Sequence, residues 1–130
     1  MSHFKKTFLP ILLTGLWINL FETIIWILLV KSYWIDRYNE MNIEFIEETI
    51  NFVVWGIWGF SFAAVIFILA KKFSLIQTTF LSWFIVFIMM WMVVYNAGVL
   101  PTKMLWFNAP LSFIGTFAAV WICKKMMPKQ

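Results

Sequence analysis

The sequence has little of what enzymes use for chemistry. Its 130 residues include a single cysteine, Cys123, and a single histidine, His3. One cysteine excludes an intrachain disulfide and any metal site built from paired cysteines. There is also no Ser-His-Asp set, no glycine-rich phosphate loop and no pair of carboxylates inside an apolar run. Hydrolytic or redox catalysis therefore has no visible machinery, and we expect no enzymatic activity, no metal and no cofactor.

Charge is scarce as well. Only 12% of the residues are charged and 63% are hydrophobic, whereas soluble domains are about 25% charged. A small soluble domain buries only about 60–70% of the surface that its unfolded chain exposes, so a lipid solvent is the simple explanation. The net charge of +4 comes largely from lysine pairs between apolar runs, such as Lys71–Lys72. They form no continuous basic face, so nucleic acid is not an expected partner.

The apolar residues fall into four long runs. A bilayer core about 30 Å thick needs roughly 20 helical residues to cross it, and residues 8–30, 52–70, 75–95 and 104–123 qualify. None of the runs alternates polar and apolar residues as the strands of a membrane barrel do. The sequence therefore predicts an all-α integral membrane protein. We expect residues 1–130 to form a single domain, a compact bundle of four transmembrane helices. Its location would be a membrane, either the cell membrane or, in a prokaryote, the inner membrane.

The lysines also predict an orientation. Short cytoplasmic loops attract Lys and Arg, so both termini are expected on the cytoplasmic side. One side of the bundle would carry Lys5, Lys6, Lys71, Lys72, Lys124, Lys125 and Lys129, and the other only Lys31, Arg37 and Lys103.

The loop over residues 31–51 is acidic. Glutamates recur in it at helical spacing, with isoleucines on the opposite side, which predicts a short extracytoplasmic helical extension before the second span. Asn39 or Asn42 is expected to cap that helix. Two interpretations remain open: a few solvated helical turns, or an acidic rim that gathers cations at the mouth of a pore or pocket. The residues concerned are Glu40, Glu44, Glu47 and Glu48, opposite Ile43, Ile46 and Ile50.

One carboxylate interrupts the first run. The stretch LWINLFETIIWILLV places Glu22 among apolar residues, and the other three runs contain no Asp, Glu, Lys or Arg. Gly15, Asn19, Glu22 and Trp26 share one helix face, with Thr23 beside them. Acids within membranes nearly always face the bundle interior or a wet cavity, so Glu22 is predicted to point at the other helices. Because no basic residue lies at its depth, we expect it to be mostly protonated near neutral pH when its site is dry.

Two roles for Glu22 are open. It could be a protonated tie, hydrogen-bonded across helices to Asn51, Asn96 or a backbone carbonyl. Alternatively, it gains and loses a proton in function, or loses the proton when a cation binds. The second role would make the protein a proton-coupled transporter or a ligand-binding protein.

Aromatic residues are abundant, with nine tryptophans. Most are explained by anchoring at the membrane interface, but several lie deeper, including Trp26 and Trp58. These are either lipid-facing or core residues, or they wall a pocket beside Glu22 that suits a lipophilic cation or a flat apolar ligand. The candidate binding residues are therefore Glu22, Asn19, Thr23, Trp26, Trp58, Tyr95, Asn96 and Asn108.

Small residues and a proline mark two of the runs. Gly56, Gly59 and Ala63 in the second run, and Ser112, Gly115 and Ala119 in the fourth, predict close helix packing within the bundle or between protomers. Pro110 removes an amide donor inside the fourth run and predicts a kinked helix, which brings Asn108 into the candidate list.

In size, in helix number and in the placement of an acid in the first span, the chain resembles the small multidrug resistance transporters. That resemblance implies a four-helix protein, functioning as an oligomer, in which Glu22 exchanges a proton for a cationic solute. It covers architecture only, since the residues around FETII do not follow that family's pattern and the loop after the first span is longer.

Two further functions remain as alternatives. One is a non-catalytic accessory or structural membrane subunit that binds a protein partner and keeps Glu22 as an interhelical tie. The other is an enzyme acting on a lipid, whose second catalytic group would have to be Asn19, Tyr95 or Asn96, all poor acids and bases. The expected partners are the lipid bilayer, a second copy or another membrane protein, and a small cationic or apolar ligand.

Overall fold

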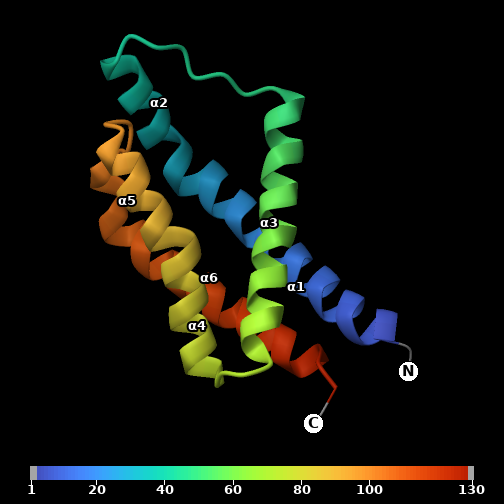
Figure 1. Ribbon diagram of the computed structural model, residues 1–130. Helices are drawn as coiled ribbons and strands as arrows, with labels where there is room; N and C mark the ends of the chain where they lie inside the picture. Colours follow the sequence, from blue (N-terminus) through green and yellow to red (C-terminus); the bar gives the residue numbers. More distant parts are fainter. Residues whose placement is uncertain (1–2, 129–130) are drawn as a thin grey trace.

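The computed structural model describes residues 3–128, and over that range the chain forms four long helices and no strands (Figure 1). Each of the four predicted apolar runs lies within one of them, which confirms the all-helical prediction. The first helix consists of α1 (His3–Ile25), the π-helical turn η1 (Trp26–Val30) and α2 (Lys31–Glu40), and the second is α3 (Thr49–Ala70). The third consists of α4 (Leu75–Trp83), the π-helical turn η2 (Phe84–Ile88) and α5 (Met89–Asn96). The fourth is the 3-10 turn η3 (Thr102–Met104) followed by α6 (Leu105–Met126).

The position predicted for the helical extension is wrong. The extension follows the first span instead of preceding the second, because the first helix continues without a break to Glu40. It ends where Asn42 adopts a left-handed conformation with φ of 58°, which asparagine tolerates better than most residues. Residues 43–48 then run without helical structure to α3. Neither Asn39 nor Asn42 caps a helix start; Glu48 precedes α3, and its backbone amide donates to Oδ1 of Asn51 at 2.9 Å.

The third helix begins at a capping box. The Ser74 hydroxyl accepts from the Gln77 backbone amide at 3.2 Å, and the Gln77 side chain accepts from the Ser74 amide at 3.1 Å. These two bonds satisfy amides that have no partner within the helix. They fix a tight turn between α3 and α4.

The helices pack in a definite order. Helix α1 lies against α3 and α6, while α4 lies against α6 and α3 (Figure 1). The predicted small-residue ridges are used inside this bundle: Ala63 and Ala119 are fully buried, and a Cβ on Gly115 would overlap the ring of Phe21 from α1. The fourth helix continues through Pro110, as predicted, and the kink expected there stays a prediction.

The exterior of the bundle is apolar. Only 17–33% of the most apolar window in each long helix is buried within the structure. Large side chains such as Val93 and Trp106 are 70% and 78% exposed. Exposed apolar surface of this extent indicates apolar surroundings or partner proteins, and all four helices are long and apolar enough to cross a membrane.

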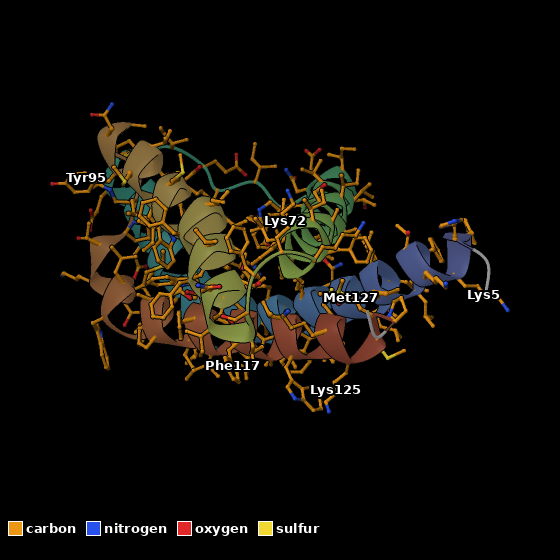
Figure 2. All side chains as sticks on the ribbon, turned by 60° about the horizontal axis from the view of Figure 1, so that its bottom comes forward. Lys5, Lys72, Tyr95, Phe117, Lys125 and Met127 are labelled. Atoms are coloured by element: carbon orange, nitrogen blue, oxygen red, sulfur yellow. The ribbon has the colours of Figure 1, made fainter. Side chains whose placement is uncertain are left out.

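The two ends of the bundle differ in charge. We call one the acidic end; it holds α2, residues 41–48 and the end of α5. The other, the lysine-rich end, holds the start of α1, the turn between α3 and α4, and the end of α6. Figure 2 shows Tyr95 at the first end and Lys5 at the second, at opposite extremes of the molecule.

Candidate functional site

Glu22 lies on the face of α1 that is turned toward the other helices. It follows the buried residues Gly15 and Ile18 by seven and four positions, and residues at these spacings share a helix face. Ile18 is only 4% exposed, whereas the Glu22 side chain is half-buried. Glu22 therefore shares the inward face of α1 and is less enclosed than Ile18.

Below Glu22, toward the lysine-rich end, α1 and α3 are in close contact. The Asn19 side chain donates from Nδ2 to the Gly15 carbonyl oxygen at 2.9 Å, which fixes the amide against its own helix. A Cβ on Gly59 would overlap this amide, and a Cβ on Gly15 would overlap the ring of Phe60. Glycine at both positions therefore lets the two backbones approach.

Above Glu22, toward the acidic end, the start of α3 is exposed. Every residue from Thr49 to Trp55 is exposed, and a Cβ on Gly56 would meet no atom within 4 Å. Residues 41–48 connect the end of α2 to the start of α3, which lie apart at the top of Figure 1. The two helices are thus in close contact at Gly59, and Glu22 lies one helical turn beyond Asn19, toward the exposed start of α3.

The Glu22 carboxyl has no partner over residues 3–128. The structure shows no hydrogen bond and no ion pair to it there. The two residues proposed as ties are otherwise placed: the Asn51 side chain caps the start of α3, and Asn96 is exposed at the end of α5. This arrangement leaves both carboxyl oxygens available to a proton or a ligand.

The two candidate tryptophans belong to different aromatic groups, and both are half-buried. Trp26 stacks on Phe45 with ring centroids 5.8 Å apart, so it holds the loop that follows α2. Trp58 packs edge-on against Phe62 and Phe87 at 5.6 and 5.8 Å, so it joins α3 to the third helix. The structure therefore gives both rings a packing role.

The remaining candidates are spread over the molecule. Thr23 is exposed, and Asn108 is buried in α6. Tyr95 is 67% exposed and lines a cavity of about 490 Å³ at the acidic end, together with Tyr33 and Arg37. Among the predicted site residues, Asn19 thus lies one helical turn from Glu22 on α1, and Trp58 is next to Gly59 on α3. Tyr95 lies in a separate pocket.

Buried hydroxyl groups line the contact between α4 and α6, and they were not predicted from the sequence. Trp83 donates from its indole to the Ser112 hydroxyl at 2.8 Å. Ser82 and Thr116 donate to carbonyls four residues earlier, at 2.6 and 2.7 Å, a common way for such residues to be satisfied within a helix. The signal was present as hydroxyl residues at i and i+4 in both runs; the members are Thr78, Thr79, Ser82, Ser112 and Thr116.

Comparison of the chain with protein-family models, with curated proteins and with solved structures finds no match. None of these comparisons adds support to the architectural resemblance to the small multidrug resistance transporters. Function has to be argued from the site itself.

Proposed function

We propose that this protein is a membrane-embedded binding protein or transporter in which Glu22 exchanges a proton for a cationic solute. The observation that carries the proposal is a carboxyl on the inward face of α1 with no partner among the described residues. An acid without a partner in a membrane helix costs several kcal/mol of free energy, roughly, and such acids usually mark ion or substrate paths.

The proposed exchange follows from the charge of one carboxyl group. When the site is empty, a proton neutralises Glu22, and this removes most of the free-energy cost of placing a charge among apolar residues. When a monovalent cation binds, it takes over that role, and the proton leaves to water. The site is neutral in both states, so the cation and the proton compete for the same oxygens.

The surroundings of Glu22 support a lipophilic cation as the solute. The part of the first helix beyond Glu22 and the start of α3 carry mainly apolar side chains, and a Cβ on Gly56 would meet no atom within 4 Å. An organic cation with apolar groups would bury those groups there while its charge approached the carboxylate. We further propose that the four helices cross a membrane with the lysine-rich end on the cytoplasmic side, because short cytoplasmic loops carry the excess of Lys and Arg.

Uptake into vesicles tests this proposal. The purified chain is reconstituted into liposomes with a pH gradient, and uptake of tetraphenylphosphonium is followed. We expect gradient-driven uptake by the native chain and its loss in Glu22→Gln, which keeps the shape of the side chain and cannot exchange a proton. Glu44→Gln makes the same chemical change in an exposed loop residue and is expected to transport normally. Uptake by Glu22→Gln at the native rate would overturn the proposal.

A second function is favoured by a different observation. Residues Thr49 to Trp55 of α3 are exposed on every side of the helix, although most of them are apolar. An accessory subunit of a larger membrane assembly would cover them with a partner. In that case Glu22→Gln would leave every transport measurement unchanged, while substitution at Val54 would prevent co-purification of the partner.

A further inference from the structure

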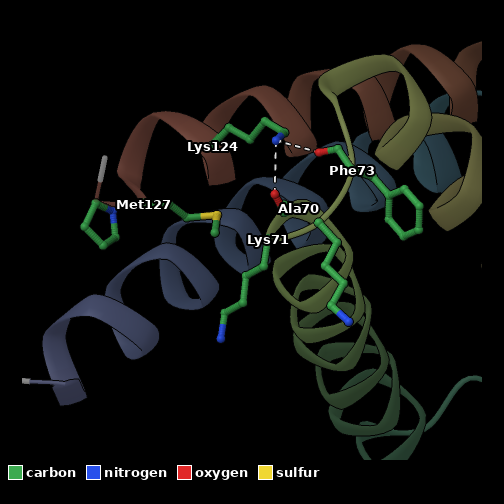
Figure 3. Close-up of a pocket in the computed structure, with 7 residues that line it drawn as sticks. Ala70, Lys71, Phe73, Lys124 and Met127 are labelled. Atoms are coloured by element: carbon green, nitrogen blue, oxygen red, sulfur yellow. Dashed lines mark hydrogen bonds between the residues drawn. The ribbon is translucent and has the colours of Figure 1, made fainter. Parts of the chain in front are cut away.

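A basic pocket lies at the lysine-rich end, where α3 ends, α4 begins and α6 ends (Figure 3). Its volume is about 340 Å³. Its lining includes the cationic side chains of Lys71, Lys72 and Lys124. It also includes the apolar side chains of Phe73, Met127 and Pro128. Cationic groups beside apolar ones suit a ligand that is itself anionic in one part and apolar in another.

Lys124 is held in position by the backbone around it. Its ammonium group donates to the Ala70 carbonyl oxygen at 3.0 Å and to the Phe73 carbonyl oxygen at 2.8 Å (Figure 3). The Ala70 carbonyl is at the end of α3 and has no partner within the helix. The Phe73 carbonyl is in the following turn and also accepts from the Thr78 hydroxyl at 3.3 Å. An ammonium group has three donors, so one N–H of Lys124 remains for a ligand, on a side chain that is already ordered.

No carboxylate side chain lies near enough to balance this charge. All six acidic residues of the chain are Glu22 or fall between positions 36 and 48. Both ion pairs of residues 3–128, Lys31–Glu47 at 2.7 Å and Arg37–Glu40 at 2.9 Å, are at the acidic end. The charge of the pocket is therefore not balanced by an Asp or Glu side chain of this chain, which leaves it available to an external anion.

Lys71 is oriented by an aromatic ring. Its ammonium nitrogen lies 4.5 Å from the centroid of the Phe67 ring, a favourable cation–π distance. Lys71 and Lys72 are both exposed. They are thus accessible to an anion that approaches from the boundary where the apolar helices end.

The position of the pocket decides between a lipid and a free anion. It lies where three helices that are long and apolar enough to cross a membrane begin or end, which is the level of phospholipid headgroups if they do cross it. Basic pockets between such helices bind anionic headgroups. We propose that this pocket binds the phosphate of an anionic phospholipid, with its glycerol and acyl chains beside Phe73 and Met127. The inference is independent of Glu22.

Native mass spectrometry of the full chain in neutral detergent tests this inference. Phosphatidylglycerol is added as the anionic probe and phosphatidylcholine as the zwitterionic one. We expect at least about tenfold tighter binding of phosphatidylglycerol, from the two or three lysines involved. The double substitution Lys71→Gln with Lys72→Gln is expected to weaken its binding by roughly 25-fold, about fivefold for each lysine removed.

The matched control removes the same charge at the same end of the molecule. This control is the double substitution Lys5→Gln with Lys6→Gln. Lys5 is at the tip of α1, away from Lys72 (Figure 2). It is expected to change binding by less than about twofold, because charges beyond a Debye length are screened. Lys71→Arg with Lys72→Arg keeps both charges and is expected to retain binding, which separates the loss of a ligand contact from a loss of folding.

Three results would overturn the inference. Equal binding of the two lipids would show that the pocket does not recognise an anionic headgroup. Equal losses in the two glutamine pairs would mean diffuse attraction to all the lysines. Displacement of phosphatidylglycerol by an equal concentration of inorganic phosphate would identify a site for a free anion.

Discussion

The side-chain amide of Asn19 packs directly on the bare backbone of Gly59, and this contact joins α1 to α3. Asn19 lies one helical turn before Glu22, so the same contact sets where the carboxyl sits relative to α3. One turn further toward the start of α3, a Cβ on Gly56 would meet no atom within 4 Å. Close packing of α3 on α1 is thus found at Gly59 and not at Gly56.

The two glycines of α3 should respond oppositely to alanine. Gly59→Ala forces the Asn19 amide to move and breaks its bond to the Gly15 carbonyl, so we expect a loss of about 1–3 kcal/mol in stability. Gly56→Ala meets no atom within 4 Å and should be neutral or stabilise by up to about 1 kcal/mol, because alanine favours the helix. Thermal unfolding in detergent measures both, and equal destabilisation by the two variants would contradict the packing described.

The hydrogen bond between Trp83 and Ser112 should contribute modestly to the packing of α4 on α6. The distance is 2.8 Å, and such bonds between membrane helices are worth about 0.6 kcal/mol on average and at most about 1.7. A double-mutant cycle with Trp83→Phe and Ser112→Ala, read out by denaturant unfolding, should give a coupling within this range. Trp106→Phe, at a largely exposed residue, serves as the control. A coupling of zero would mean that the bond does not contribute.

The sequence predicted the helices well and the tertiary arrangement poorly. The four apolar runs and the helix through Pro110 were found because length and hydropathy are local properties. The extension predicted from Glu40, Glu44, Glu47 and Glu48 before the second span is wrong, because residues 43–48 are not helical and the helical extension is instead α2, which continues the first helix. Glutamate spacing alone does not say which residues of a loop form a helix. The placement of Tyr95 in a separate pocket depends on contacts between distant residues, which periodicity does not encode.

Glu22 illustrates the same limit. Its helix face was predictable from spacing, and that face does carry the buried residues Gly15 and Ile18. The absence of a hydrogen-bond partner for its carboxyl among residues 3–128 was not predictable, because Asn51 was an equally reasonable partner until its role as a cap was seen.

The loop before α3 should be held by Phe45. Its ring lies 5.8 Å from Trp26 and 5.0 Å from Tyr38, and each such contact is worth about 0.5–1.5 kcal/mol. We expect Phe45→Ala to speed exchange by about tenfold at the hydrogen-bonded amides of Ile43, which donates to Tyr38, and Glu48, which donates to Asn51. Ile46→Ala removes an exposed side chain from the same loop and should change exchange little. Similar rates in the two variants would contradict a role for the ring.

The proposed orientation is tested by labelling from outside the cell. With Cys123 replaced by alanine, Glu44→Cys should react with a membrane-impermeant maleimide in intact cells. Lys72→Cys should react only after the membrane is permeabilised, because it lies at the lysine-rich end. The reverse pattern would invert the topology, and labelling of both sites in intact cells would mean that the helices do not cross the membrane.

Proton release on cation binding is the direct signature of exchange at Glu22. Tetraphenylphosphonium is added to the purified protein in weakly buffered detergent solution, and the change in pH is recorded. If Glu22 exchanges a proton for the cation, the native chain should release up to one proton per bound cation. Glu22→Gln, with its other acids intact, should release none. Binding of the cation without proton release by the native chain, or the same release by Glu22→Gln, would contradict this exchange.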